Sequence, residues 1–367
     1  MKIIVSSSSF LYGLKKIIGV VSNNAVNPVM NNVKFTAKDG ALLLTGINSL
    51  MVNEATVNAT ILDPGETTLP MRKLYQIASA LPQDDVVIET VSDTNDVVSI
   101  TCGKATYRII GLSPVGFPDK EICAGSNSFQ VDARAFVSSL NQVSPAICAD
   151  ESRHALNGVL LELSDGNLAV VATDGRRLAT CQHHVDYTTP NGVSSTRIII
   201  SAVTVMELIK TIDVTQPLLI SFNQSSVEIK SGETVITALL VEGVYPNYSS
   251  VIPDSFAHSM TVDRVTLLGV IKRVSLVLDN MDGLKFTADG NSLELSAHSA
   301  RYGESKESMD IDVAGEPTTF TLNADFMIQP LSKLDCDKLI IQYNTSDTPI
   351  ALRNSDDFLY ILMPMRL

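Results

Sequence analysis

Alternating apolar and polar positions recur in three similar segments of the chain. Residues 31–46, 156–172 and 281–297 read NNVKFTAKDGALLLTG, LNGVLLELSDGNLAVVA and MDGLKFTADGNSLELSA. Each segment has two alternating apolar runs around an Asp-Gly pair, which predicts a β-hairpin. Asp39, Asp165 and Asp289 are 126 and 124 residues apart. A spacing this regular predicts three copies of one structural unit.

Helical periodicity flanks each hairpin. Before it, apolar residues recur at offsets 0, +4, +7 and +11, and after it at offsets 0, +3, +4 and +7. Both spacings keep the apolar side chains on one stripe of an α-helix, so we expect two amphipathic helices in every copy. The stripes before the hairpins are Phe10, Leu14, Ile17 and Val21; Phe136, Leu140, Val143 and Ile147; and Leu267, Ile271, Val274 and Leu278. The stripes after the hairpins are Leu74, Ile77, Ala78 and Leu81; Val205, Leu208, Ile209 and Ile212; and Met327, Pro330, Leu331 and Leu334.

Three residues should determine where these helices begin or end. Asp132 and Asp263 stand just before the first helix of copies two and three, where a carboxylate can accept hydrogen bonds from the free N–H groups of the first turn. Pro330 removes a hydrogen bond from the last helix and should kink or shorten it.

Short alternating stretches, such as DVVIETV and TYRIIGL, fill the rest of each copy and predict antiparallel strands. The fold class is therefore α+β, with three repeated domains that each have two helices packed on antiparallel sheets. Turn-rich and polar segments at 123–128 and 252–258 separate the copies. We expect domains at 1–124, 125–256 and 257–367.

Composition narrows the class of protein. With 367 residues, 45% of them hydrophobic and 18% charged, the chain is globular and large enough for several cores. No apolar run approaches the length of a membrane helix, and the start MKIIVSSSSF lacks the apolar stretch of a signal peptide, so a cytoplasmic location is expected. Five cysteines without a CxxC pair predict neither a disulfide framework nor a metal site, and no cofactor is expected.

The positive charge gathers on the predicted helices. The net charge of −13 divides into +5 on the helices and −18 on the remainder. Such a distribution suits a protein that surrounds a polyanion and touches its phosphates weakly on one face. Each cation could equally be an ordinary solvated residue on an amphipathic helix. The ten residues that would face such a polyanion are Lys15, Lys16, Arg72, Lys73, Arg134, Lys210, Arg264, Lys272, Arg273 and Lys333.

Two further motifs are specific. The second hairpin continues into VVATDGRRLAT at 170–180, and the chain ends in ILMPMRL at 361–367. LNG at 156–158, Phe-Pro at 117–118 and Tyr-Pro at 245–246 fall in matching order. With these motifs the sequence resembles the bacterial DNA polymerase III beta subunit family, the sliding clamps, over its full length. The resemblance implies a non-catalytic ring, formed by a head-to-tail homodimer, with helices lining a hole that encircles double-stranded DNA without reading its sequence.

The resemblance also implies a groove between the second and third domains that binds a short peptide. Its partners would be the DNA polymerase III alpha subunit, the clamp loader and other proteins with a clamp-binding motif. A pocket of apolar residues and flexible methionines can accept several peptide sequences, although Leu156, Leu178 and Val251 could also be plain core. Ser250, Ala202 and Val203 stand where the family often has basic residues. The groove residues would be Leu156, Thr173, Gly175, Arg177, Leu178, Pro246, Val251, Met363, Pro364, Met365 and Arg366.

By the same resemblance, a strand edge of the first domain meets the first helix of the third domain across the dimer contact. Tyr107 and Ile109 would then face Leu276 and Val277. Ordinary core packing is the alternative for all four residues.

Two other classes of protein compete. An enzyme could use Cys181 with His183 and His184, but a strand divides these side chains between its faces and no third ligand is marked. The chain has no Walker loop, GxGxxG or HExxH motif, and Asp174 before a glycine is better suited to a turn than to acid catalysis. A repeat-built scaffold that binds proteins without DNA is the second competitor.

Overall fold

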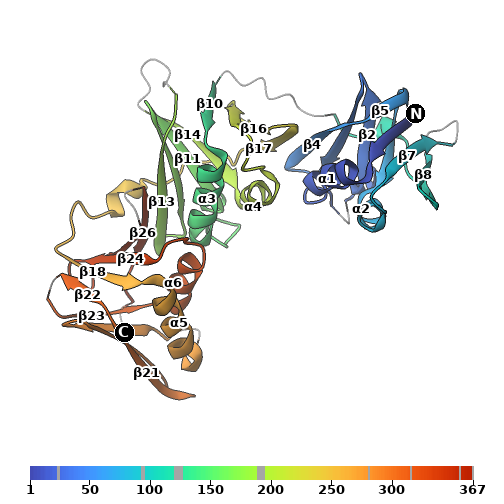
Figure 1. Ribbon diagram of the computed structural model, residues 1–367. Helices are drawn as coiled ribbons and strands as arrows, with labels where there is room; N and C mark the ends of the chain where they lie inside the picture. Colours follow the sequence, from blue (N-terminus) through green and yellow to red (C-terminus); the bar gives the residue numbers. More distant parts are fainter. Residues whose placement is uncertain are drawn as a thin grey trace. The chain divides into compact units, whose positions relative to one another are not determined.

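The chain packs as two compact units. The computed structural model describes residues 1–22, 25–91, 96–119, 127–187, 195–279, 282–314, 316–354 and 357–365 (Figure 1). Unit 1 consists of Met1–Val137 with Met206–Leu240, and unit 2 of Ser138–Val205 with Val241–Leu367. The domain boundaries near residues 124 and 256 stay predictions, and residues 120–126 lie outside the described part of the chain.

The three predicted hairpins are confirmed. They are β2 (Asn32–Lys38) with β3 (Ala41–Ile47), β11 (Gly158–Ser164) with β12 (Asn167–Thr173), and β19 (Leu284–Asp289) with β20 (Ser292–Ser299). In the first turn, Asp39 and Gly40 both have positive φ, 51° and 77°, as the tight turn of a twisted hairpin requires. In the third copy the turn shifts by one residue, because Asp289 still pairs with Ser292.

Both predicted helices are present in every copy. The first helices are α1 (Ser7–Ile17), α3 (Ala133–Val143) and α5 (Arg264–Val274), and the second are α2 (Met71–Ala80), α4 (Ala202–Thr211) and α6 (Ala324–Leu331). Asp132 Oδ1 accepts the Ala135 N–H at 2.8 Å, and Asp263 Oδ1 accepts the Thr266 N–H at 2.7 Å, so both caps are confirmed. Helix α6, with Pro330 inside it, has eight residues against ten in α2 and α4. The predicted shortening is confirmed.

Unit 1 contains two antiparallel sheets, ordered β5-β1-β7-β8-β9 and β10-β15-β16-β17-β4-β3-β2-β6. Helix α1 packs on β3 and β4, so the helices cover one face of the hairpin sheet (Figure 1). The strands not yet bounded are β1 (Lys2–Ser6), β4 (Met51–Asn58), β5 (Thr60–Asp63), β6 (Gly65–Pro70), β7 (Asp85–Thr90), β8 (Val97–Cys102), β9 (Ala105–Ile110), β10 (Asn127–Val131), β15 (Leu218–Phe222), β16 (Ser226–Ser231) and β17 (Thr234–Leu239).

Unit 2 also contains two antiparallel sheets, ordered β14-β11-β12-β13-β26-β25-β24-β18-β22 and β21-β20-β19-β23. Helix α5 packs on β20 and β21, as α1 does on β3 and β4 in unit 1. The remaining strands are β13 (Arg177–His184), β14 (Thr196–Ser201), β18 (His258–Asp263), β21 (Gly303–Asp310), β22 (Asp312–Ala314), β23 (Thr318–Leu322), β24 (Lys338–Tyr343), β25 (Ile350–Arg353) and β26 (Phe358–Leu362).

Consecutive copies join through paired strands. We call the β4–β17 pairing in unit 1 the first seam, and the β13–β26 pairing in unit 2 the second seam. In each, the strand that follows the hairpin of one copy pairs with the last strand of the next copy. The corresponding strands that take part in neither seam are β21 of the third copy and β9 of the first, and each lies at the end of its sheet. Among the described residues, no helix has both the length and the apolarity to cross a membrane.

Candidate functional site

The segment Thr173–Arg177 forms a hydrogen-bonded turn between β12 and β13. Thr173 Oγ1 donates to the Arg177 carbonyl at 2.6 Å and accepts the Gly175 N–H at 3.1 Å. Asp174 Oδ1 accepts the N–H groups of Arg176 and Arg177 at 2.9 and 3.1 Å. Gly175 has a φ of 88°, which a glycine adopts without strain. Asp174 is therefore a turn residue, as its position before a glycine predicted.

Arg177 points into the second seam rather than toward solvent. It is 8% exposed, and its Nε lies 2.9 Å from Asp174 Oδ2. Its Nη1 donates to Gln329 Oε1 at 2.9 Å and to the Tyr360 hydroxyl at 3.3 Å. Its Cζ also lies 4.1 Å from the centre of the Phe326 ring. Arg177 thus ties the turn of the second copy to α6 and β26 of the third.

Two more of the expected groove residues are buried. Leu156 and Leu178 are 8% and 2% exposed and share one apolar cluster with Tyr245 and Ile361. This is the core environment that the alternative interpretation foresaw. Leu178 directly follows the turn at 173–177, so the cluster borders this turn, and we call the region around both the candidate surface.

The outer part of this surface is apolar and partly open. Val251 and Met363 are 49% and 46% exposed, and Pro246 is exposed as well. The C-terminal segment is held by backbone hydrogen bonds from Met363 N to the Arg176 carbonyl at 3.1 Å and from Met365 N to the Thr321 carbonyl at 2.8 Å. Strand pairing and the bond from Met363 thus place the turn at 173–177 beside the C-terminal segment, and Leu156 joins Leu178 in the apolar cluster. Arg366 lies outside the described residues, and the groove as a whole stays a prediction.

Two cations near this surface were not expected. Arg153 is exposed and its Nη1 donates to the Asp174 carbonyl at 2.7 Å, while Arg176 is exposed at the tip of the turn. The sequence did contain two signals for these cations. Arg153 lies three positions before the LNG segment, and Arg176 is the first residue of the Arg-Arg pair in the turn.

One wall of the surface is anchored by a carboxylate. Tyr248 begins the short helical turn that ends at Val251, and its hydroxyl donates to Glu162 Oε2 at 2.7 Å. Arg197 Nε donates to Glu162 Oε1 at 2.8 Å. Burial works to raise the pKa of Glu162, but the hydrogen bonds from Tyr248 and Arg197 prevail and hold the pKa below its ordinary value.

Eight of the ten helical cations are exposed; Lys16 and Arg264 are half-buried. Lys16 does not point freely into solvent, because its Nζ reaches across the first seam to the Thr211 carbonyl at 2.5 Å. This burial lowers the pKa of Lys16. Arg264 folds back in the same way, with its Nε donating to the Cys336 carbonyl at 2.6 Å.

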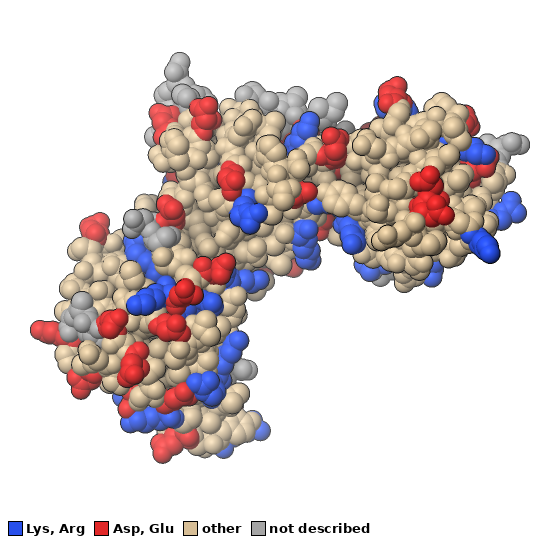
Figure 2. Space-filling view, in the orientation of Figure 1, with Lys and Arg blue, Asp and Glu red and all other residues tan. Residues whose placement is uncertain are grey.

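Arg273 is exposed but already paired, since its Nε and Nη2 lie 2.9 and 2.5 Å from the Glu307 carboxylate oxygens. On the face that Figure 2 shows, basic and acidic side chains of the third copy are interspersed. The cations therefore form a diffuse distribution rather than a dense patch on that face.

The residues expected at a dimer contact lie on the last strand of a sheet and in a short helical turn. Tyr107 and Ile109 are half-buried on β9, where they pair with Ile100 and Val98 of β8. Leu276 is 81% exposed and Val277 half-buried in the short helical turn Ser275–Val277.

The enzyme alternative has little support. Burial raises the pKa of Cys181 to about 12, so its thiol is not an activated nucleophile. His183 Nε2 lies 2.7 Å from Ser139 Oγ. Within the described ranges, no group of three His, Cys, Asp or Glu residues could hold a metal ion.

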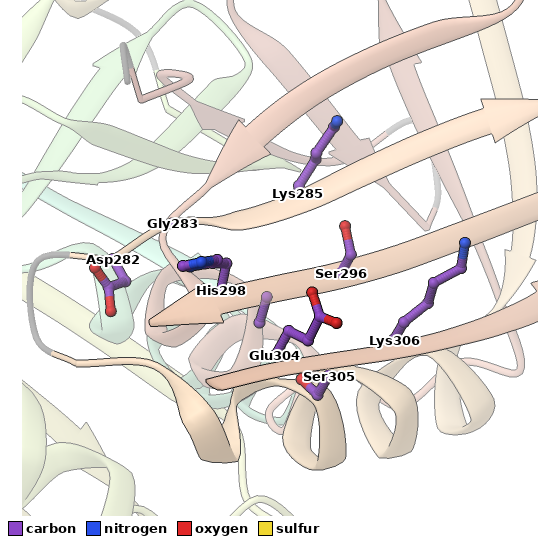
Figure 3. A pocket seen from close by; sticks show the side chains of 9 residues that line it. Asp282, Gly283, Lys285, Ser296, His298, Glu304, Ser305 and Lys306 are labelled. Carbon is purple, nitrogen blue, oxygen red and sulfur yellow. The ribbon is translucent and has the colours of Figure 1, made fainter. Parts of the chain in front are cut away.

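A pocket of about 540 Å³ opens over β19, β20 and β21. Figure 3 shows Lys285, Ser296 and Lys306 on neighbouring strands, with His298 and Glu304 at one end. The charges there are mixed, and Lys306 pairs with Glu294 at 2.5 Å. The pocket therefore has no clear preference for an anion or a cation.

Known proteins resemble the chain along its whole length. Family models of the DNA polymerase III beta subunit match it in three parts: the N-terminal domain at 1–121, the central domain at 130–247 and the C-terminal domain at 249–366. The beta sliding clamp of Chlamydia muridarum is 27% identical over 370 residues, which cover 100% of this chain and 99% of that protein. The beta sliding clamp of Synechococcus elongatus is 26% identical over 375 residues, with 100% of both chains covered. The crystal structure of the DNA polymerase III subunit beta from Pseudomonas aeruginosa superposes with a TM-score of 0.92 at 25% identity, and all of both chains is covered.

Proposed function

Because the chain belongs to the DNA polymerase III beta subunit family, we propose that two copies close head to tail into a ring around double-stranded DNA. As a member of that family it acts as a sliding clamp, a non-catalytic processivity factor in DNA replication. The finer parts of the proposal are the closing contact, the DNA-facing residues, the peptide groove and a cytoplasmic location.

The closing contact follows from the two internal seams. At the first seam, Met51, the first residue of β4, pairs with Ala238, the fifth residue of β17. At the second, Arg177, the first residue of β13, pairs with Leu362, the fifth residue of β26. The same register applied to the unused strands pairs Gly303 of β21 with Ile109 of β9. Because these strands belong to opposite ends of one chain, a second copy supplies the partner, and the contact is heterologous and closes a ring.

Burial at the internal seams supports this assignment. The residues of β17 equivalent to Tyr107 and Ile109 are Ile236 and Ala238, which are 1% and 2% exposed. The third residue after the first helix is Val20 in copy one and Ala146 in copy two, 2% and 0% exposed. Its equivalent in copy three is Val277. In the proposed dimer, Tyr107, Ile109 and Val277 gain the burial that their counterparts already have.

The two free edges are also complementary in charge. Residues 103–110, at the β9 edge, include Lys104 and Arg108 and no acidic residue, while residues 303–310 of β21 include three acidic residues and one lysine. The edges thus carry +2 and −2. The shared register sets Arg108 directly opposite Glu304 of the partner subunit, an attractive cross-strand pair.

Helices of all three copies would line the hole and touch DNA. The exposed cations among the ten candidates are Lys15, Arg72, Lys73, Arg134, Lys210, Lys272, Arg273 and Lys333. Since a closed ring is retained by topology, weak phosphate contacts suffice, and the acidic remainder of the chain discourages nonspecific binding elsewhere. The second copy contributes least, because Ala202 and Val203 begin its second helix.

The surface above Leu156 and Leu178 would receive a short peptide from the DNA polymerase III alpha subunit, the clamp loader and other partners. Its apolar floor, its exposed methionine and its two neighbouring arginines suit a peptide with apolar anchors and an acidic residue. Ser250 offers no charge to such a peptide, so Arg153 and Arg176 supply the positive rim.

The observation that carries the proposal is the identical register of the two seams. Replacing Arg108 with Glu should raise the dimer dissociation constant about tenfold or more, because it sets two like charges opposite each other in a heterologous contact. Adding Glu304→Arg restores the attraction and should restore the dimer, as measured by sedimentation equilibrium. Retention of the loaded protein on circular DNA, with loss from linear DNA, tests the ring. A wild-type protein that stays monomeric at all concentrations overturns the proposal.

A further inference from the structure

The first seam carries an apolar surface at the position that the peptide groove occupies on the second seam. We propose that this surface, which we call the first-seam surface, binds a short uncharged apolar segment of a partner protein. The inference rests on the proposed groove at the second seam, because the two surfaces are related by the internal repeat.

The equivalence is residue by residue. The hairpin alignment and the strand registers relate Met30, Ile47 and Val52 of the first copy to Leu156, Thr173 and Leu178 of the second. Phe117 and Pro118 correspond to Tyr245 and Pro246 in the Phe-Pro and Tyr-Pro motifs. In the structure Val29, Ile47 and Phe117 form one apolar cluster with Met30 and Val52 packed against it. The first seam therefore has its own floor, built from the counterparts of the groove floor.

The rim of the two surfaces is held by the same backbone hydrogen bond. At the second seam, Met363 N donates to the Arg176 carbonyl at 3.1 Å. At the first seam, the equivalent residue Leu239 donates its N–H to the carbonyl of Leu50, the equivalent of Arg176, at 2.9 Å. Both seams thus bring a residue of the last strand against the tip of the turn that precedes β4 or β13.

The first-seam surface leaves apolar side chains in water. Leu50 is 39% and Leu239 42% exposed, close to the 46% of Met363 at the second seam. Val115, two residues before Phe117, is 93% exposed. The neighbouring cluster of Val29, Ile47 and Phe117 is itself buried, with exposures of 5%, 7% and 7%. Exposed apolar groups at the rim of a buried apolar floor are typical of a surface that binds apolar ligands.

The charge of the residues around the first-seam surface determines which kind of peptide can bind there. The cations of the second seam have uncharged counterparts at the first: Asn27 for Arg153, Leu50 for Arg176 and Met51 for Arg177. These three positions therefore offer no cation to an acidic residue of a ligand. The occupant is therefore a segment with apolar anchors and no carboxylate, and the two seams discriminate between peptides by charge.

The test uses the full-length protein with labelled methyl groups and a capped, uncharged hexapeptide of alternating leucine and serine. We expect saturable NMR shifts of the Met30 and Ile47 methyls on titration. Leu50→Asp with Leu239→Asp, both at the solvent-exposed rim, should weaken this response about tenfold. The matched substitution Met363→Asp at the second seam should leave it unchanged and reduce only the response of Val251.

Three results overturn the inference. The first is a response confined to Val251 and its surroundings, which leaves the groove of the second seam standing and makes the first-seam surface plain core. The second is a shift of Met30 and Ile47 that follows protein concentration without peptide, which identifies a second copy of the chain as the occupant. The third is no response at either seam, which counts against the proposed groove as well.

Discussion

Replacing Arg177 with alanine should destabilise unit 2 more than an alanine substitution at any exposed position of that unit. Arg177 is 8% exposed and Asp174 has a side-chain exposure of 15%, so their ion pair is largely shielded from water. Removing the cation leaves the Asp174 carboxylate with its two backbone N–H donors but without its charge partner. Gln329, Tyr360 and Phe326 lose the guanidinium at the same time.

The magnitude follows from these contacts. Each hydrogen bond to a charged group contributes about 1.5–3 kcal/mol, and a cation–π contact about 0.5–2 kcal/mol. These terms share one side chain and do not add in full. Breaking a buried ion pair by removing one partner costs about 3–5 kcal/mol, which is the loss of unfolding free energy that we expect for unit 2. Arg177→Lys should recover only part of it, because an ammonium cannot bind two acceptors in a fork and stack on the Phe326 ring.

Urea unfolding of the full-length protein, followed by far-UV circular dichroism since the chain has no Trp, measures the effect. Hydrogen exchange of β26 and α6 should increase in the same variant, because Arg177 joins them to the turn at 173–177. The matched control is Arg176→Ala at the exposed neighbouring position, which should change stability by less than about 0.5 kcal/mol. If Arg177→Ala and the control lie within about 1 kcal/mol of each other, the reasoning about the second seam is refuted.

Three further predictions concern the DNA-facing helices, the groove and the acid limit of stability. Lys15→Glu with Lys272→Glu should shorten residence on circular DNA at low salt without changing the dimer dissociation constant; unchanged residence in a single-molecule assay would remove these residues from the inner face. Met363→Ala with Met365→Ala should weaken binding of a partner-derived peptide in calorimetry about tenfold while the sedimentation profile stays dimeric; unaltered affinity contradicts the groove. The pKa of Glu162 is lowered by its hydrogen bonds, so its contribution is fully present above the unfolded pKa of about 4.3 and is lost as the pH falls through the lower folded pKa. Glu162→Gln should therefore lower the unfolding free energy at pH 7. The unfolding free energy of this variant should also fall less steeply between about pH 5 and 3 than that of the wild type. An equally steep fall in both proteins would exclude a contribution of the Glu162 carboxylate to stability.

Much of the fold was predictable because its signals are local. The alternation around each Asp-Gly pair and the helical stripes depend on residues a few positions apart, and the structure confirms three hairpins and six helices in the described ranges. The caps by Asp132 and Asp263 and the shortening at Pro330 are equally local. The period of the repeat followed from these local signals because the same pattern returned twice.

The candidate site was only partly predictable. Its motifs identified the turn at 173–177 and the C-terminal segment, but not which side chains lie beneath the surface. Leu156 and Leu178 lie in a buried apolar cluster, and Arg153 reaches the turn through a hydrogen bond to the Asp174 carbonyl, which the spacing of the motif does not indicate.

The sequence by itself determined the repeating unit, its helices and its hairpins, since each is stabilised by contacts between near neighbours. Only the tertiary structure decided where the cations point: Arg177 meets Gln329 across 152 residues, and Lys16 meets Thr211 across 195. It also decided the common register of the two seams, and it places β9 and β21 at the ends of their sheets, each with a strand partner on one side among the described residues. Such contacts depend on how distant segments pack together, and helical or strand periodicity along the chain carries no information about that packing.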